Sequence, residues 1–450
     1  MNQLPQGWTR VELSDAVTLK TGPFGSALHK YDYVHDGIPL VNPMHIINAC
    51  IKPTLDVTVT PETGARLSEF RLKAGDLILA RRGEMGRCAV VREKEVGWLC
   101  GTGSLIVRPF HVLLNADFLQ YFLSCSSSVK YLLEASVGST MANLNQQHLL
   151  SMELSLPPLT EQTRIVAKLE ELLSDLDAGV AELKAAQHKL VQYRQSLLKA
   201  AVTGALTADW RAQNTAPESG AALLARILQE RRARWEEKQL AKFASQGKAL
   251  PKDWQKKYPE PVQPDTTGLP ELPQGWVWAS VDQLCEFVRN GLSKTPNTDQ
   301  LGFPIFKINA VRPMAVNFTA IKHIEIPEAE AADYWVERGD VLATRYNGSV
   351  DLLGVFAMVK DLPEQTLHPD KLIRMKPVTG ESVGAWMEIN GNVGESRKHL
   401  VSRVKTTAGQ TGISGDDLKK TPIPLPPTIE QTIAIELTKE RLESIKELEQ

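Results

Sequence analysis

Leucines recur at every seventh position in the middle of the chain, and this pattern predicts a long helix. A second seam of mostly apolar or small residues, from Ile165 to Ala200, runs beside them in the same register. Two such seams are typical of a helix that packs along one stripe, either in a coiled coil or against its own domain. A helix from Thr160 to Ala201 would be ~63 Å long at ~1.5 Å per residue, the length of a spacer. The five leucines are Leu169, Leu176, Leu183, Leu190 and Leu197.

Shorter apolar runs bounded by glycine predict a β-hairpin on each side of this helix. The segments "LKAGDLILARRGEMGRCAVV" (72–91) and "VERGDVLATRYNGSVDLLGVFAMV" (336–359) each contain Gly-Asp, an apolar run, a glycine-containing turn and a second apolar run. In the second segment, Asn347-Gly348 is a favoured pair for a tight turn. We interpret the two Gly-Asp pairs as turns before a strand rather than as acidic sites.

The two hairpins belong to a duplication of a larger unit. "LPQGW" occurs at 4–8 and again at 272–276, and "LSLPPLTEQTRIV" (154–166) matches "IPLPPTIEQTIAI" (423–435). We therefore predict an α+β protein in which a β-rich domain, a Pro-Pro pair and a helix occur twice. The predicted parts are a first β-rich domain (1–158), a first spacer helix (159–203), a central basic helix with a Pro-rich linker (204–270), a second β-rich domain (271–427) and a short second spacer helix (428–450).

The loops of the two copies differ although the frame repeats. "TLKTGPFGSALHKYDY" in the first copy and "FVRNGLSKTPNTDQLG" in the second have little in common. Because loops on a rigid scaffold carry specificity, two like frames with unlike loops suggest the same task on two different targets.

Charge limits how such a protein can bind nucleic acid. The net charge is −2, and Lys+Arg against Asp+Glu number 14 and 14 in residues 1–158, 11 and 8 in 204–270, and 17 and 19 in 271–427. Nucleic acid would therefore have to meet a local basic face. A predicted helix at 219–247 offers such a face, which either meets phosphates, lies in solvent or docks on a partner. Its arginines are Arg226, Arg231, Arg232 and Arg234.

The sequence carries no signal of secretion, of a membrane span or of catalysis. It shows no signal peptide and no apolar stretch of ~18 residues, and its five cysteines form no CxxC pair, which together predict a cytoplasmic protein without a zinc site. We find no P-loop, no HExxH, no GxSxG and no Asp/Asn-Pro-Pro-aromatic motif of amino-methyltransferases. The sequence therefore predicts a chain that binds rather than catalyses.

Polar residues in the duplicated loops are the candidate DNA contacts. Arginine and lysine suit guanine edges and phosphates, whereas asparagine and glutamine suit adenine edges. In the first copy the candidates are Lys20, Ser26, His29, Lys30, Arg81, Arg82, Thr140, Asn143 and Asn145. In the second copy they are Arg289, Asn290, Lys294, Arg345, Tyr346, Asn347, Lys371, Lys405, Gln410 and Thr411.

The motifs together resemble the specificity subunit of a type I restriction-modification system. The duplicated LPxGW, the β-rich domain, LPPxxEQ and a heptad helix ending in "GALTADWR" (204–211) carry the resemblance over nearly the whole chain. The resemblance implies that each β-rich domain is a target recognition domain that reads one half of a split, asymmetric site in double-stranded DNA. It also implies that the two spacer helices pack antiparallel and set the gap between the half-sites.

The same resemblance implies partners and places their cofactors elsewhere. Two modification (methyltransferase) subunits would dock on the spacer helices and carry S-adenosylmethionine, and restriction (motor-nuclease) subunits would use ATP and Mg²⁺. The chain itself would bind no cofactor or metal and would have no catalysis of its own. The second helix lacks the length and the LTxxWR-like tail expected of the family, so we expect a shortened chain in which part of the leucine stripe is uncovered. A free-standing two-headed DNA-binding regulator and a coiled-coil protein-interaction scaffold are the alternatives.

Overall fold

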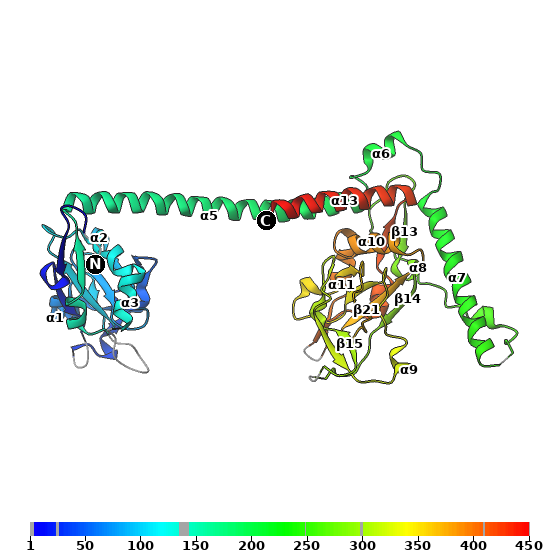
Figure 1. Ribbon diagram of the computed structural model, residues 1–450, viewed down its shortest axis with the longest axis horizontal. Coiled ribbons are helices and arrows are strands. Elements are labelled where there is room, and N and C mark those ends of the chain that lie inside the picture. The colour runs from blue at the N-terminus through cyan, green and yellow to red at the C-terminus, as the bar shows by residue number, and fades with distance from the viewer. Residues whose placement is uncertain are drawn as a thin grey trace. The chain divides into compact units, whose positions relative to one another are not determined.

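The computed structural model describes residues 4–23, 27–134, 144–247, 249–297, 300–407 and 410–449. The chain folds as two compact units, residues 1–182 and 183–450, shown in Figure 1. Both units mix helices with β-sheet, as predicted.

The first unit is built around a four-stranded antiparallel sheet. In spatial order its strands are β2 (Val17–Thr21), β11 (Ser104–Pro109), β8 (Leu77–Ala80) and β9 (Cys88–Val90). Leu77 and Leu79 pack in a core with the helices α2 (Ala116–Ser124) and α3 (Ser126–Glu134), whereas Ile78 packs in a second core on the other face. The two-residue period of a strand produces this alternation and buries both faces of the sheet.

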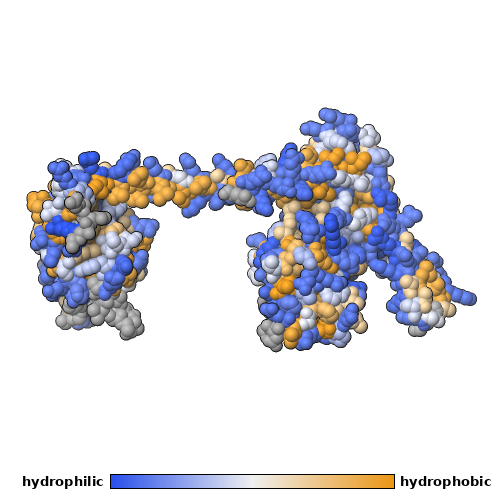
Figure 2. Space-filling model, in the orientation of Figure 1, coloured by the Kyte–Doolittle hydropathy of each residue, from blue (hydrophilic) through white to orange (hydrophobic). Residues whose placement is uncertain are grey.

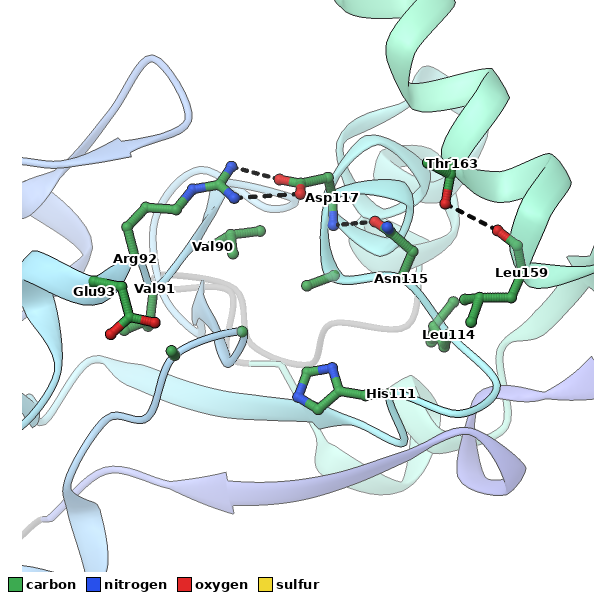
Figure 3. A pocket seen from close by; sticks show the side chains of 13 residues that line it. Val90, Val91, Arg92, Glu93, His111, Leu114, Asn115, Asp117, Leu159 and Thr163 are labelled. Atoms are coloured by element: carbon green, nitrogen blue, oxygen red, sulfur yellow. Dashed lines mark hydrogen bonds and ion pairs between the residues drawn. The ribbon is translucent and has the colours of Figure 1, made fainter.

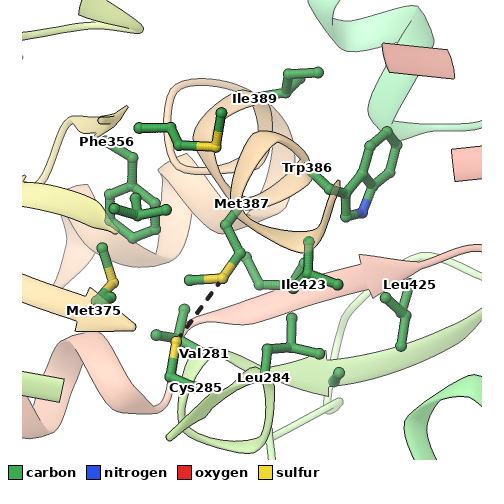
Figure 4. Close-up of a cluster of buried hydrophobic side chains, with 14 of the residues drawn as sticks. Val281, Leu284, Cys285, Phe356, Met375, Trp386, Met387, Ile389, Ile423 and Leu425 are labelled. Atoms are coloured by element: carbon green, nitrogen blue, oxygen red, sulfur yellow. Dashed lines mark hydrogen bonds between the residues drawn. The ribbon is translucent and has the colours of Figure 1, made fainter. Parts of the chain in front are cut away.

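The second unit repeats this sheet with the same connections. Its strands, in spatial order, are β14 (Cys285–Asn290), β21 (Leu372–Pro377), β19 (Val341–Thr344) and β20 (Phe356–Met358). The helices α10 (Glu381–Asn390) and α11 (Gly394–Ser402) cover one face. Figure 4 shows the core beneath them, where the buried Trp386 donates its indole N–H to the carbonyl of Pro424 at 2.6 Å.

Each unit adds smaller elements to its central sheet. In the first unit these are β3 (Tyr33–Val34), β4 (Ile38–Val41), β5 (Ile46–Ile47), β6 (Cys50–Ile51), β7 (Thr58–Val59), β10 (Leu99–Cys100), α1 (Pro61–Arg66) and α4 (Gln146–Leu150). In the second unit they are α8 (Val281–Leu284), β15 (Phe303–Phe306), β16 (Val311–Arg312), β17 (Ala315–Val316), β18 (Ile321–Ile324), α9 (Glu328–Ala331), β22 (Lys405–Thr407), β23 (Gln410–Gly412) and α12 (Gly415–Lys419).

The LPQGW repeat forms the same turn in both copies. The backbone N–H of Trp8 donates to the carbonyl of Pro5 at 3.1 Å, and that of Trp276 donates to Pro273 at 3.0 Å. Gly7 and Gly275 have φ of +88° and +86°, which is why glycine stands at this position. Two strand pairs then join the start of each domain to its Pro-Pro segment: β1 (Thr9–Glu12) with β12 (Glu153–Leu156), and β13 (Val277–Ser280) with β24 (Pro422–Leu425).

The two predicted hairpins are confirmed, with one correction. β8 pairs with β9 and β19 with β20, both antiparallel. The Gly-Asp pairs are turns, and their aspartates form inward ion pairs, Asp76 with Arg108 and Asp340 with Arg374, both at 2.6 Å. The prediction of a tight turn at Asn347-Gly348 is wrong, because residues 345–355 connect β19 to β20 and Tyr346 bridges to Gly412 instead.

The predicted spacer helix is α5 (Leu159–Val202), a single helix of 44 residues. The shorter α13 (Thr428–Leu448) runs antiparallel to the end of α5, because Glu449 pairs with Arg194 at 3.4 Å while Glu430, at the other end of α13, bonds to Thr207. Leu197 is only 4% exposed there, whereas Leu176 and Leu183 are 61% and 67% exposed. Figure 2 shows hydrophobic side chains along the exposed length of α5. Of the five leucines of the stripe, Leu197 is thus buried within this chain, Leu169 and Leu190 are partly covered, and Leu176 and Leu183 are exposed.

A buried carboxylate ties the second helix to the rest of its unit. Glu430 is 1% exposed and accepts hydrogen bonds from the Thr207 hydroxyl at 2.7 Å and the Trp276 indole N–H at 2.9 Å. The guanidinium of Arg211 also donates to this carboxylate. Three motifs that are far apart in the sequence, LPQGW, GALTADWR and LPPxxEQ, therefore meet at one residue.

The central segment contains α6 (Ala208–Gln213) and α7 (Gly220–Ser245). Leu223 and Ile227 of α7 are buried in the core of the second unit. The four arginines of the predicted basic helix all have acidic or carbonyl partners inside the chain, which favours a docked face over one that meets phosphates. In the described part of the chain, no helix is long and apolar enough to cross a membrane.

Candidate nucleic-acid interface

Arg81 and Arg345 occupy the same place in the two copies. Each follows the first strand of its hairpin. The backbone N–H of Arg81 donates to Gly103 at 2.9 Å, and that of Arg345 donates to Lys371 at 2.8 Å. Their carbonyls accept from Leu144 and Ile413 respectively, both at 2.9 Å. The duplicated frame therefore fixes one arginine at an equivalent point in each unit, through the backbone and independently of the loop sequences.

The surroundings of Arg345 leave its guanidinium suited to a polar ligand. Its Cζ lies 4.8 Å from the centre of the Tyr346 ring, and Nζ of Lys371 lies 5.1 Å from the same ring. Nη1 reaches the carbonyl of Asp370 at only 3.4 Å, and Nε is buried with no hydrogen-bond partner in the described structure. Two cations close to one aromatic ring, with donors to spare, create a positive site that fits a phosphate or the acceptor edge of guanine.

The first unit gathers positive charge at the equivalent point. Burial lowers the pKa of Arg81, and the charge of the neighbouring Arg82 lowers it further. Arg82 itself is exposed, and Arg87 at the far end of the same connection donates to the carbonyl of Pro43 at 3.2 Å. Because arginine stays charged in proteins, an anionic ligand would stabilise the partly buried Arg81 next to the exposed Arg82.

Other first-unit candidates are held by neighbours within the chain. Lys20 forms an ion pair with Glu69, and Asn145 caps α4 by accepting from the backbone N–H of Gln147 at 2.9 Å. Lys30 is exposed, and the half-buried His29 stacks on Tyr31 with ring centres 5.0 Å apart. Ser26, Thr140 and Asn143 lie outside the described residues.

The second-unit candidates also differ in whether their side chains have partners within the chain. Ion pairs hold Arg289 to Asp333, Lys294 to Glu330 and, at 3.9 Å, Lys405 to Asp417. Asn290 is exposed; the Asn347 side chain accepts from Ser349, and the Thr411 hydroxyl lies 3.2 Å from that of Thr406. Gln410 pairs through its backbone with Thr407, and its side chain lies outside the description. The structure brings Arg345, Tyr346 and Lys371 together; for the whole set, contact with DNA stays a prediction.

One cavity of about 480 Å³ lies in the first unit beside the start of α5, away from Arg81 (Figure 3). Part of its wall is held by internal contacts, since Arg92 pairs with Asp117 and Asn115 accepts from the backbone N–H of Asp117, and Glu93 and His111 also line it. Among the described residues no three His, Cys, Asp or Glu side chains are grouped so as to hold a metal ion. None of the described candidate DNA contacts lines this cavity.

Comparisons with known proteins show what the chain is similar to. The family model "Type I restriction modification DNA specificity domain" matches residues 5–185. The type I restriction enzyme EcoKI specificity subunit of Escherichia coli K12 is 28% identical, over 95% of this chain and 81% of the relative. The StySPI specificity subunit of Salmonella potsdam is 23% identical, with the same two coverages. The chain is therefore similar to the specificity subunits of type I restriction-modification systems.

Solved structures support the fold of the chain. The crystal structure of the HsdS subunit from Thermoanaerobacter tengcongensis matches with a TM-score of 0.56 at 19% identity, over 99% of this chain and 92% of that one. A chain from a structure described for the complex assembly and conformational transition of a type I R-M system matches with a TM-score of 0.59 at 17% identity, over 100% and 93%. The resemblance to type I specificity subunits seen in the motifs is confirmed by the family model and the relatives, and the solved structures confirm the fold.

Sequence reasoning missed several residues that lie beside the candidate contacts or hold the second helix in place. Tyr31 is 80% exposed beside His29, and Arg87 closes the connection that carries Arg81. A sequence signal existed for both, since Tyr31 follows the candidate pair His29-Lys30 and Arg87 lies within the predicted hairpin. The role of Glu430 gave no signal beyond the repeat, because its partners come from three distant segments.

Proposed function

We propose that the chain is a specificity subunit that reads a split sequence in double-stranded DNA, one half with each β-rich domain, residues 1–158 and 271–427. The observation that carries the proposal is the equivalent backbone anchoring of Arg81 and Arg345 within frames whose loops differ. Like frames give both domains the same approach to DNA, and unlike loops give them different bases to read. A free-standing regulator is not favoured, because the relatives are subunits of restriction enzymes.

Within this proposal Arg345 contacts a guanine edge and Lys371 a nearby phosphate. A guanidinium presents a fork of donors that matches the O6 and N7 acceptors of guanine, whereas an ammonium acts as a point charge. Tyr346 holds the guanidinium plane between the domain and the DNA. Arg81 takes the same role for the other half-site, with Arg82 at its side.

The exposed stripe of α5 is proposed as the docking surface for modification subunits, two per complex. Burying a leucine side chain yields about 1.5–3 kcal/mol, so several exposed leucines on one helix favour a protein partner. S-adenosylmethionine is assigned to these subunits, and ATP and Mg²⁺ to the restriction subunits. The exposed leucines of the stripe are Leu176 and Leu183, and the neighbouring Leu172 and Val180 are exposed beside them.

The experiment that tests the two-reader proposal is a domain exchange. Residues 1–157 are replaced by the same segment of a relative, and methylated sites are sequenced from cells that carry the complete system. One half of the recognised sequence should change while the other half and the gap stay the same. The reciprocal exchange of residues 271–427 is the matched control and should change only the other half. A change in both halves from either exchange contradicts the proposal.

The length of α5 is tested separately. Insertion of four residues after Ala186 lengthens the helix by ~6 Å at ~1.5 Å per residue. The gap in the methylated site should widen while both half-site sequences stay the same. A full methylation pattern with the original gap would mean that α5 does not set the spacing.

A further inference from the structure

Lysine collects at the far end of α7 and in the segment after it. Residues 238–258, "KQLAKFASQGKALPKDWQKKY", contain six lysines and a single acidic residue, Asp253, in a chain whose net charge is −2. This lysine arm is the most basic stretch of its length that the function proposed above leaves without a role. Its charge is a local footprint of the kind that a polyanion recognises.

The first half of α7 anchors the arm to the second unit. Gly220 donates its backbone N–H to Gly275 at 2.7 Å, and a Cβ at this position would lie 2.3 Å from the carbonyl oxygen of Leu425. The buried Arg231 donates from Nε to the carbonyl of Cys285 at 2.9 Å. Glu286 then pairs with both Arg234 and Lys238. The anchoring contacts of α7 with the domain reach Lys238, where the lysine arm begins.

Aromatic contacts fold the returning segment back onto the helix. Trp254 stacks on Trp235 with ring centres 5.9 Å apart, and Tyr258 meets Trp235 edge-on at 5.4 Å. The Tyr258 hydroxyl lies 2.5 Å from Nη1 of Arg231, which also donates to the carbonyl of Pro259 at 3.0 Å. These contacts hold the arm in one conformation before it binds. Binding a ligand through the arm therefore costs little conformational entropy.

Three lysines of the arm are available to a ligand. Lys242, Lys252 and Lys257 form no ion pair with any described residue, whereas Lys256 pairs with Asp253. Figure 1 shows the C-terminal end of α7 at the same end of the unit as α9, far from α13. That end also holds Lys294, a candidate DNA contact that pairs with Glu330 of α9 at 2.8 Å.

We propose that the lysine arm binds the phosphate backbone of duplex DNA outside the second half-site. This proposal rests on the proposed function for the orientation of the DNA. Lysine suits phosphates because its ammonium group acts as a point charge, and neutralising phosphates releases condensed counterions. The arm adds affinity without reading bases, so it leaves the recognised sequence unchanged.

The test compares two triple variants of the full chain on DNA. One carries Lys242→Gln, Lys252→Gln and Lys257→Gln; the charge-matched control carries Lys130→Gln, Lys168→Gln and Lys398→Gln, three lysines already paired on their own helices. The logarithm of the binding constant is measured against the logarithm of salt concentration. The arm variant should lose about 2–3 units of slope, at about 0.9 per phosphate contact, and the control should lose less than one.

Duplex length locates the contact. Wild type should bind a duplex that extends past the second half-site more tightly than one that stops there, and the arm variant should lose this preference. Trp254→Ala, which removes the stacking of Trp254 on Trp235, should weaken binding to the long duplex only. Equal slopes for the two triple variants would overturn the proposal, as would an arm variant that loses only its assembly with another protein. If the proposed function is wrong, wild type should show no preference for its mapped site over a scrambled duplex. The salt slopes measured on the scrambled duplex would still test the arm.

Discussion

The starts of α5 and α13 carry the same Pro-Pro-x-x-Glu-Gln sequence but differ in what surrounds the glutamate. Glu430 of α13 is buried under Thr207, Arg211 and Trp276. The carboxylate of Glu161 on α5 has no hydrogen-bond or ion-pair partner among the described residues, and the indole N–H of Trp8 is likewise buried without an acceptor there.

The difference comes from the segment that follows α5. Gly204, with φ of +73°, ends the helix and turns residues 204–211 over the start of the antiparallel α13. Arg211 donates back to the carbonyl of Gly204 at 3.0 Å, which fixes this turn. The glutamate of the repeated motif is therefore buried only where a third segment, residues 204–211, packs over it. We make four predictions that compare equivalent residues of the two copies.

The largest expected effect is on stability at the two glutamates. Glu430→Ala should lower the free energy of unfolding of the second unit by about 3–5 kcal/mol, because it leaves Arg211 and two buried donors without their acceptor. Glu161→Ala, the matched control, should change the stability of the first unit by less than about 0.5 kcal/mol. Amide hydrogen exchange along α5 and α13 measures both. Equal losses at the two sites would show that the buried cluster does not distinguish the helix starts.

A second contrast concerns pH. His368 and Cys100 are fully buried at equivalent places in the two units. Cys100 follows Leu99, which pairs in parallel with Leu40, and His368 follows Leu367, which pairs in parallel with Ile305. Burial lowers the pKa of His368 from 6.5 to about 4. The unfolded chain therefore takes up a proton at a higher pH than the folded chain, so stability present above pH 6.5 is lost as the pH falls from about 6.5 to about 4.

This loss should reach about 3 kcal/mol in the second unit, at about 1.4 kcal/mol per pH unit. His368→Cys, which gives the second unit the residue of the first, should remove most of it. Urea unfolding of both proteins at pH 6.5 and pH 4.5 provides the measurement. The same acid sensitivity in wild type and variant would assign it to other groups.

A smaller effect is expected at Tyr346, whose counterpart in the first unit is the exposed Arg82. Tyr346→Leu removes the aromatic face on which Arg345 and Lys371 lie, and should weaken binding to the recognised duplex by about 0.5–1 kcal/mol. Tyr346→Phe keeps the face and serves as the control. Competition binding on one duplex measures the two variants together, and a loss equal for both would implicate the hydroxyl instead.

The sequence predicted the frame better than the contacts within it. The duplication, the hairpins and the long helix follow from local apolar periods, and α5 and the strand pairs confirm them. The path of Arg345-Tyr346 was not predictable, because Tyr346 pairs with Gly412, more than sixty positions away, and this pairing overrides the local turn preference of Asn347-Gly348. The Glu430 cluster and the lysine arm depend in the same way on contacts between distant segments.

The candidate site was predictable in residue type and only partly in arrangement. Arg81 and Arg345 were among the candidates because they follow apolar runs at equivalent places in the repeat. Asn145 was chosen for its amide, yet in the structure that amide caps α4. A polar loop side chain serves the backbone as readily as a ligand, and the sequence does not distinguish the two.

The central claim is that two equivalently anchored arginines read separate halves of one site. The most direct test is to sequence the methylated sites in cells whose complete system carries either Arg81→Ala or Arg345→Ala. Each variant should relax specificity at one position, at a cost of about 1–3 kcal/mol, and the two positions should lie in opposite halves of the site. Relaxation in the same half, or a uniform loss of methylation with no change of sequence in either variant, would contradict it.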